Sequence, residues 1–176
     1  FSKLCDRLKI LQPVWDKFSD ITSACKFANK VSYPVLIRPS FVLSGSAMSV
    51  CYTDSELKTF IRKVSLVNKN HAITVSKFIT GAREIELDGV GMRGKILVYA
   101  ISEHVEHAGV HSGDATIVYP PQRVYLHTAQ RMIKIATSLA LELKITGPFN
   151  IQYLVKDNEV FVIEMNLRAS RTFPFI

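Results

Sequence analysis

The sequence predicts an α+β fold with a largely antiparallel sheet. Apolar residues recur at helical spacing in the first 64 residues and again at residues 128–143. From Ala72 onwards most other segments read as strands, and short turns separate them. Strands joined by short turns pair antiparallel, because a parallel pair needs a long crossover connection. These observations favour an α+β fold over a doubly wound parallel sheet.

Helices and strands alternate in the first 64 residues. Gln12-Pro13 ends a first helix, Tyr33-Pro34 breaks a second one, and Thr53 with Glu56 forms a capping box for a third. These helices are expected at residues 1–11, 20–31 and 54–64. Short strands are expected at residues 35–37 and 48–52, separated by small and hydroxyl residues at 40–47.

Strands dominate the second half of the chain. They are expected at residues 73–78, 83–90, 95–102, 150–155 and 160–165. In the second of them Ile85 and Leu87 alternate with the acidic residues Glu84, Glu86 and Asp88. The last two form a hairpin, and the long helix at 128–143 precedes it.

The composition excludes several classes of protein. The chain has 176 residues, which suits one domain or one domain with two lobes. Its 48% hydrophobic and 21% charged residues exclude a disordered, collagenous or coiled-coil chain. A net charge of +7 favours anionic ligands. The basic residues are dispersed without interleaved aromatics, and no apolar run approaches 18 residues, so we expect neither a nucleic-acid nor a membrane partner.

The chain begins at Phe1 and ends on an apolar run, so we expect it to be a piece of a longer protein. Its three cysteines form no paired motif and favour a reducing compartment over a disulfide framework.

Two patterns in the sequence imitate functional motifs. Residues 89–94 match G-x-G-x-x-G, but a strand follows instead of the helix that dinucleotide binding needs, which favours a hairpin turn. His104, His107 and His111 could face one side of a helix and bind zinc. Gly109 and Gly113 make such a helix improbable, so the zinc site is disfavoured.

The C-terminal hairpin carries the strongest chemical pattern. Glu164 and Asn166 share one face of a strand, and Asn150 and Gln152 share a face of its partner. A carboxylate with carboxamide oxygens suits a hard cation such as Mg²⁺. An exposed hairpin with scattered polar residues is the alternative interpretation.

Basic and glycine-bearing segments could accompany this metal. Arg168 and Arg171 follow the hairpin and could bind a phosphate or carboxylate. A metal ion together with such arginines is typical of sites for phosphoryl transfer. Residues 109–114 could bring backbone N–H groups to an anion. Arg38 precedes the small-residue loop, which could close over phosphates as a lid.

Together these segments resemble a known family. Residues 33–48, 103–114, 149–152 and 163–175 are similar, in this order, to the ATP-grasp domain of the carbamoyl-phosphate synthetase large chain. The resemblance implies an ATP-grasp fold, with two mainly antiparallel lobes and the nucleotide site between them. It divides the chain into a helical lead-in (1–32), a lid lobe (33–80) and a catalytic sheet lobe (81–176).

The family has two homologous halves, of which the first phosphorylates bicarbonate and the second carbamate. Residues 103–114 and Phe173-Pro174-Phe175 resemble the second half, and Ser44 resembles eukaryotic members. The implied activity is that of a ligase that phosphorylates carbamate to carbamoyl phosphate in pyrimidine, arginine or urea metabolism. The alternatives are the bicarbonate half, another ATP-grasp ligase, and a non-catalytic nucleotide-binding module.

The resemblance also implies a role for each site residue. The cofactors would be ATP and Mg²⁺ (or Mn²⁺). The implied metal ligands are Gln152, Glu164 and Asn166, the first two of which also bind nucleotide. The implied adenine and ribose contacts are Lys77, Phe78, Ile79 and Glu84. Residues beside the nucleotide are Gly109, Val110, His111 and Ser112. Catalytic contacts to phosphate or carbamate are implied for Arg38, Arg168 and Arg171.

The implied partners are ATP, carbamate, the remainder of the synthetase chain, and a glutaminase domain or subunit. The implied location is the cytoplasm, with the mitochondrial matrix as the alternative. One departure concerns Ser46, which stands where bacterial members carry an arginine that contacts ATP. Met165 and Leu167 also depart from the common pattern but leave the metal ligands intact.

Overall fold

The computed structural model describes residues 1–39, 48–67, 72–108 and 115–175, with only the backbone described at 65–67. The chain divides into two units, Phe1–Gln12 with Gly81–Ile176, and Pro13–Thr80. Residues 1–32, expected as a helical lead-in, are therefore shared between the two units. Both sheets are antiparallel throughout, as the sequence predicts. None of the described helices is long and apolar enough to span a membrane.

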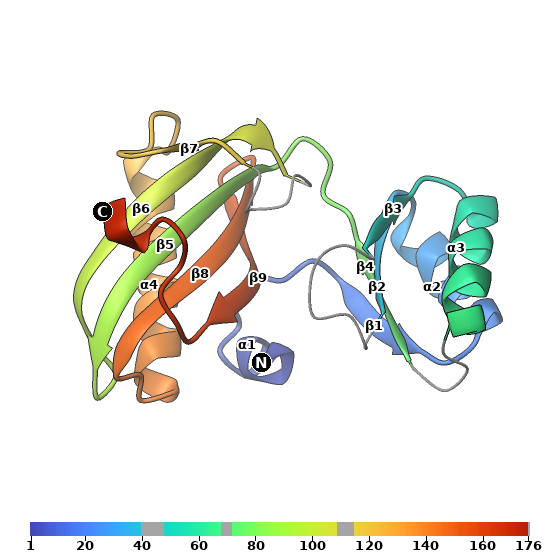
Figure 1. The fold of residues 1–176 in the computed structure, drawn as a ribbon, viewed down its shortest axis with the longest axis horizontal. Coiled ribbons are helices and arrows are strands. Elements are labelled where there is room, and N and C mark those ends of the chain that lie inside the picture. Colours follow the sequence, from blue (N-terminus) through green and yellow to red (C-terminus); the bar gives the residue numbers. More distant parts are fainter. Residues whose placement is uncertain (40–47, 68–71, 109–114, 176) are drawn as a thin grey trace. The chain divides into compact units, whose positions relative to one another are not determined.

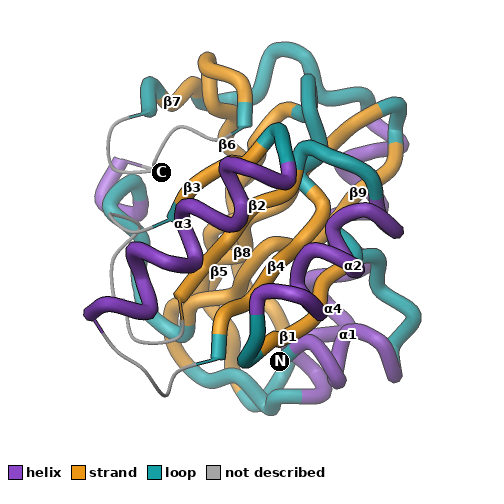
Figure 2. The backbone as a smooth tube through the Cα atoms, turned by 90° about the vertical axis from the view of Figure 1, so that its right-hand side faces the viewer, coloured by secondary structure: helices purple, strands orange, loops and turns teal. Residues whose placement is uncertain are grey.

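The smaller unit is a four-stranded sheet with two helices. Its strands are β1 (Trp15–Phe18), β2 (Val35–Pro39), β3 (Ser49–Cys51) and β4 (Ile73–Lys77), in the order β1-β4-β2-β3. Figure 2 shows α2 (Ile21–Val31) and α3 (Asp54–Val67) on the same side of this sheet. Buried residues of both helices and of β2, β3 and β4 form one apolar core.

Local hydrogen bonds explain where these helices begin. Asp20 caps α2, because its carboxylate accepts a hydrogen bond of 2.8 Å from the backbone N–H of Ser23. Thr53 caps α3 by accepting from the N–H of Glu56 at 3.2 Å, which confirms half of the predicted capping box. The carboxylate of Glu56 binds the N–H of Tyr52 at 2.8 Å, one residue before the expected position.

The larger unit is a five-stranded sheet covered on one face by a long helix (Figure 1). The strands are β5 (Arg83–Met92), β6 (Lys95–His107), β7 (Ile117–Val118), β8 (Gly147–Lys156) and β9 (Glu159–Asn166), in the order β7-β6-β5-β8-β9. Its helices are α1 (Ser2–Arg7), α4 (Leu126–Glu142) and the short 3₁₀ turn η2 (Phe173–Phe175). Buried residues of α4 pack against Ile85, Leu87, Ile151 and Tyr153.

Two sequence predictions need correction here, and one strand was not predicted. The first helix ends at Arg7 rather than at residue 11, and β1 was not predicted. The strand expected to end at residue 102 continues to His107. The helical zinc site that the sequence disfavours does not form at His104 and His107, because both lie on a strand, where His104 is buried and His107 is exposed. His111 lies outside the described residues.

The G-x-G-x-x-G segment is confirmed as a hairpin turn between β5 and β6. Its glycines are required by packing and backbone conformation. A Cβ at Gly89 would lie 2.7 Å from the Phe149 ring, and one at Gly91 would lie 2.9 Å from the carbonyl oxygen of Ile145. Gly94 has φ +86°, which favours glycine. The motif therefore seats the hairpin against the end of α4 and the start of β8.

We expect Gly91→Ala to lower the free energy of unfolding by about 1–3 kcal/mol, because the added methyl group would meet a backbone carbonyl. Urea denaturation would measure the change. Lys95→Ala, at an exposed position of the same hairpin, is the control and should change stability by less than about 0.5 kcal/mol. Equal stability of the two variants would contradict this explanation of the motif.

Candidate nucleotide and magnesium site

One face of the larger sheet is polar and buried. Glu84, Glu86 and Asp88 alternate along β5 with the apolar residues that face α4, and they are only 7%, 3% and 1% exposed. On the neighbouring strand Gln152 pairs with Glu86 and Asn150 pairs with Asp88. The alternation predicted from the sequence is therefore present, but both sets of side chains are buried.

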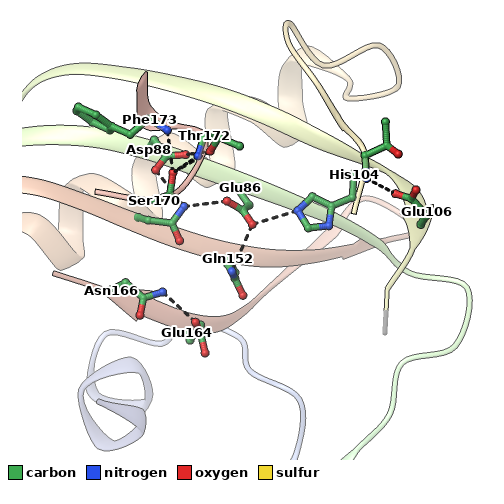
Figure 3. A network of polar contacts seen from close by, with 12 residues as sticks. Glu86, Asp88, His104, Glu106, Gln152, Glu164, Asn166, Ser170, Thr172 and Phe173 are labelled. Carbon is green, nitrogen blue, oxygen red and sulfur yellow. Dashed lines mark hydrogen bonds and ion pairs between the residues drawn. The ribbon is translucent and has the colours of Figure 1, made fainter. Parts of the chain in front are cut away.

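Glu86 lies at the centre of a hydrogen-bond network, shown in Figure 3. One carboxylate oxygen accepts from the side-chain N–H of Gln152 at 3.3 Å and lies 3.0 Å from the Nε2 atom of His104. The other oxygen accepts from the amide of Asn150 at 3.0 Å. Asn150 also donates to Asp88 at 3.1 Å and so joins the two carboxylates. Both buried acids are stabilised by donors from other strands.

The three residues predicted to bind metal share this face. Gln152 on β8 pairs directly with Glu164 on β9, and Asn166 lies two residues further along β9. The amide of Asn166 donates to a carboxylate oxygen of Glu164 at 2.8 Å. Since Gln152 and Asn166 each use their amide N–H groups on a carboxylate, their oxygens remain available as ligands.

His104 is the basic side chain that contacts Glu86. Burial disfavours its protonation, but the hydrogen bond to Glu86 and the charges of Glu84, Glu86 and Glu106 outweigh burial and raise the pKa of His104. Across the described residues, neither Glu86 nor Asp88 forms an ion pair with a lysine or arginine. When protonated, His104 therefore compensates part of the buried negative charge.

Glu103, next to His104, has a structural role. Burial raises the pKa of this carboxyl, but the backbone N–H groups of Arg123 and Gln122 and the Arg123 guanidinium lower it more, so the net pKa shift is downward. Both N–H contacts are 2.9 Å long, and so is the contact from the Arg123 side chain. Glu103 therefore ties β6 to the chain that leads into α4.

Comparison with known families decides the identity of the fold. A family model described as the carbamoyl-phosphate synthase L chain, ATP binding domain, matches residues 7–175. The chain belongs to this family. The resemblance drawn from the sequence is thus confirmed.

Relatives in the carbamoyl-phosphate synthase family match along the whole chain. It is 49% identical to "Multifunctional protein ura1" of Schizosaccharomyces pombe and 48% identical to mitochondrial carbamoyl-phosphate synthase (ammonia) of Rattus norvegicus. Each alignment covers 100% of this chain but only 8% and 12% of those proteins. The chain therefore spans about a tenth of the length of these curated relatives.

Solved structures confirm the predicted ATP-grasp fold. The biotin carboxylase domain of Hydrogenobacter thermophilus 2-oxoglutarate carboxylase, solved with MgADP, ADP and bicarbonate, has a TM-score of 0.80 at 15% identity, over 98% of this chain and 39% of that one. The D-alanine–D-alanine ligase of Bacillus anthracis, complexed with ATP, has a TM-score of 0.69 at 20% identity, over 94% of this chain and 52% of that one.

The remaining predicted residues of this family member are distributed along the chain. In the larger unit, Arg168 and Arg171 are exposed beyond β9, and the Arg168 guanidinium donates to the carbonyl of Ala169 at 3.1 Å. In the smaller unit, Arg38 is exposed on β2. The Lys77 ammonium donates to the carbonyls of Ser32 and Tyr33 at 2.8 and 3.2 Å, and so closes the turn before β2. Phe78 and Ile79 follow β4 and are half-buried.

Several predictions lie outside the described residues. They concern the lid loop with Ser44 and Ser46, and the nucleotide contacts at Gly109, Val110, His111 and Ser112. Conversely, sequence reasoning assigned no role to Glu86, Asp88, His104 or Thr172. The signal for the acids was present, since three of them alternate on one strand that is central in the sheet.

We expect His104 to stabilise the protein most at low pH. Because its pKa is raised on folding, this contribution is fully present below the unfolded value of about 6.5 and is lost as the pH rises through the folded pKa. The difference in unfolding free energy between the unsubstituted protein and His104→Gln should therefore shrink with rising pH. Urea titrations between pH 5.5 and 9 would measure it.

His127→Gln is the matched control, because His127 is exposed at the start of α4. It should show a small difference throughout this pH range. A His104→Gln difference that grows with pH would contradict the assigned charge interaction.

Proposed function

We propose that this chain phosphorylates carbamate with ATP, as part of a carbamoyl-phosphate synthetase. The observation that carries the proposal is the convergence of Gln152, Glu164 and Asn166 on one face of the β8–β9 hairpin. Arg168 and Arg171 follow directly after this hairpin. A metal-binding set beside two guanidinium groups suits the transfer of a phosphoryl group, whose charge must be stabilised.

The donor set fits Mg²⁺. It offers one carboxylate and two carboxamide oxygens, which are hard ligands of the kind this ion takes. Few protein ligands leave coordination positions for water and for the phosphates of ATP. Bound there, Mg²⁺ would neutralise charge on the β- and γ-phosphates. Mn²⁺ is the alternative ion for the same ligands.

The protein side chains bind and orient the reactants. A carbamate oxygen would attack the γ-phosphorus, and the bond from this phosphorus to the β,γ-bridging oxygen would break to give carbamoyl phosphate and ADP. Arg168 and Arg171 would hold carbamate or the transferred group, and Arg38 would reach the phosphates from the lid lobe (33–80). Catalysis would then rest on positioning and charge neutralisation in the catalytic lobe (81–176).

Glu84 would accept hydrogen bonds from the ribose hydroxyls, and Lys77, Phe78 and Ile79 would line the adenine. The burial of Glu84 on the same polar face of β5 as Glu86 supports this assignment. The contacts with nucleotide at residues 109–112 remain part of the same proposal.

Carbamate is favoured over bicarbonate by two sequence segments, residues 103–114 and Phe173-Pro174-Phe175.

The rest of the protein would include further synthetase regions and a glutaminase domain or subunit, since the chain covers a small share of its relatives. A cytoplasmic location is proposed, with the mitochondrial matrix as the alternative.

We expect Glu164→Gln to slow phosphoryl transfer about a hundredfold, because the metal site loses its anionic ligand. The effect should be measured in the full-length protein as ATP formation from ADP and carbamoyl phosphate at several Mg²⁺ concentrations. Glu159→Gln, at the exposed start of the same strand, is the control and should retain activity. Equal activity of both variants would refute the metal assignment.

The choice of substrate has its own test. The full-length protein with Glu164→Gln should lose ATP formation from ADP and carbamoyl phosphate but keep bicarbonate-dependent ATP hydrolysis. The reverse pattern would assign this chain to bicarbonate phosphorylation.

A further inference from the structure

The arginine-bearing segment, residues 167–172, follows β9. It forms no helix or strand, and η2 follows it as a single 3₁₀ turn. Figure 1 shows the segment turning back from the end of β9 over the sheet. The segment carries Arg168 and Arg171, both exposed. Its position must therefore come from side-chain contacts.

Asp88 provides the main contact. This residue lies on the central strand of the five-stranded sheet and is 1% exposed. One of its carboxylate oxygens accepts from the amide of Asn150 at 3.1 Å, and the other accepts from the hydroxyl of Thr172 at 3.2 Å. The carboxylate thus binds the sheet with one oxygen and the arginine-bearing segment with the other.

Ser170 completes the attachment, as Figure 3 shows. Its hydroxyl oxygen accepts from the backbone N–H groups of Thr172 and Phe173 at 3.2 and 3.1 Å. It also lies 2.8 Å from the hydroxyl oxygen of Thr172. Either hydroxyl can be the donor in this last contact.

Arg171 lies between the two attached residues. We propose that Asp88 is a positioning residue for Arg171, acting through Thr172 and Ser170. The inference rests on the proposed function, because it assigns Arg171 to the transferred phosphoryl group or carbamate. Because hydrogen bonds hold both neighbouring residues, the Arg171 backbone has little conformational freedom. The guanidinium therefore extends from a fixed backbone position.

The energetics of Asp88 support this role. Burial raises the pKa of its carboxyl, although the hydrogen bonds from Ser170, Asn150 and Thr172 oppose the shift. An ionised group whose pKa is raised on folding costs stability above its unfolded pKa. The carboxylate is therefore better explained by the attachment of the segment than by a gain in stability.

Two substitutions remove the attachment with little change in shape. Asp88→Asn has one oxygen where two are needed, so either Asn150 or Thr172 loses its acceptor. Thr172→Val removes the hydroxyl. Thr172→Ser keeps the hydroxyl and should restore the behaviour of the unsubstituted protein. Asp157→Asn makes the same chemical change in the exposed β8–β9 turn and is the matched control.

The first measurement does not depend on activity. Trypsin cuts after arginine where the backbone opens locally, so cleavage after Arg168 and Arg171 in the full-length protein reports on the segment. Asp88→Asn and Thr172→Val should each raise this cleavage rate roughly tenfold, because a hydrogen bond to a charged group is lost. Thr172→Ser and Asp157→Asn should leave it unchanged. Unchanged cleavage in both disruptive variants would overturn the proposal.

The second measurement is ATP formation from ADP and carbamoyl phosphate. Asp88→Asn and Thr172→Val should lower kcat roughly tenfold with an unchanged KM for ADP, and the double variant should lose no more than either single one. Raised cleavage with unchanged kcat would overturn the positioning role. If the unsubstituted protein lacks this reaction, the proposed function fails, whereas the cleavage rates still decide whether Asp88 holds the segment.

Discussion

The burial of carboxylates on the central strand of the larger sheet determines what surrounds them. Glu86 and Asp88 are almost inaccessible to water, and an ionised carboxylate in such a place is costly unless donors surround it. The neighbouring strands supply those donors through Asn150, Gln152 and His104. The polar layer is therefore a set of mutually dependent contacts, in which removal of one member leaves others unsatisfied.

The donors acquire a fixed orientation from this arrangement. A carboxamide has a donor end and an acceptor end, and a flipped Gln152 would bring its oxygen against the Glu86 carboxylate. The same holds for Asn166 beside Glu164. The acids thus decide which atom each amide offers to a ligand. In this way Glu86 orients a side chain of the proposed metal site without belonging to that site.

Sequence periodicity predicted which side chains of the site share a face, but not how deeply they are buried. A period of two places Gln152 with Asn150, and Glu164 with Asn166, and the register of β8 and β9 confirms this. The burial of Glu86 and Asp88 was not predictable in the same way, because polar residues alternating along an antiparallel strand usually face water. Thr172, which contacts Asp88, lies 84 positions away in sequence. The edge strand β1 was missed because its sequence, Trp15-Asp16-Lys17-Phe18, does not alternate apolar and polar residues.

One face of the larger sheet is apolar and contributes to the core, and the other face carries the buried polar residues. Ile85 and Leu87 face α4 and join the apolar core, while their neighbours Glu86 and Asp88 occupy the opposite face. Since each strand serves both faces, a slip of one residue would exchange acids for apolar side chains and is strongly disfavoured. The apolar core thereby fixes the register of the polar layer. Burial of this apolar core also contributes free energy that offsets the cost of burying the charged side chains on the other face.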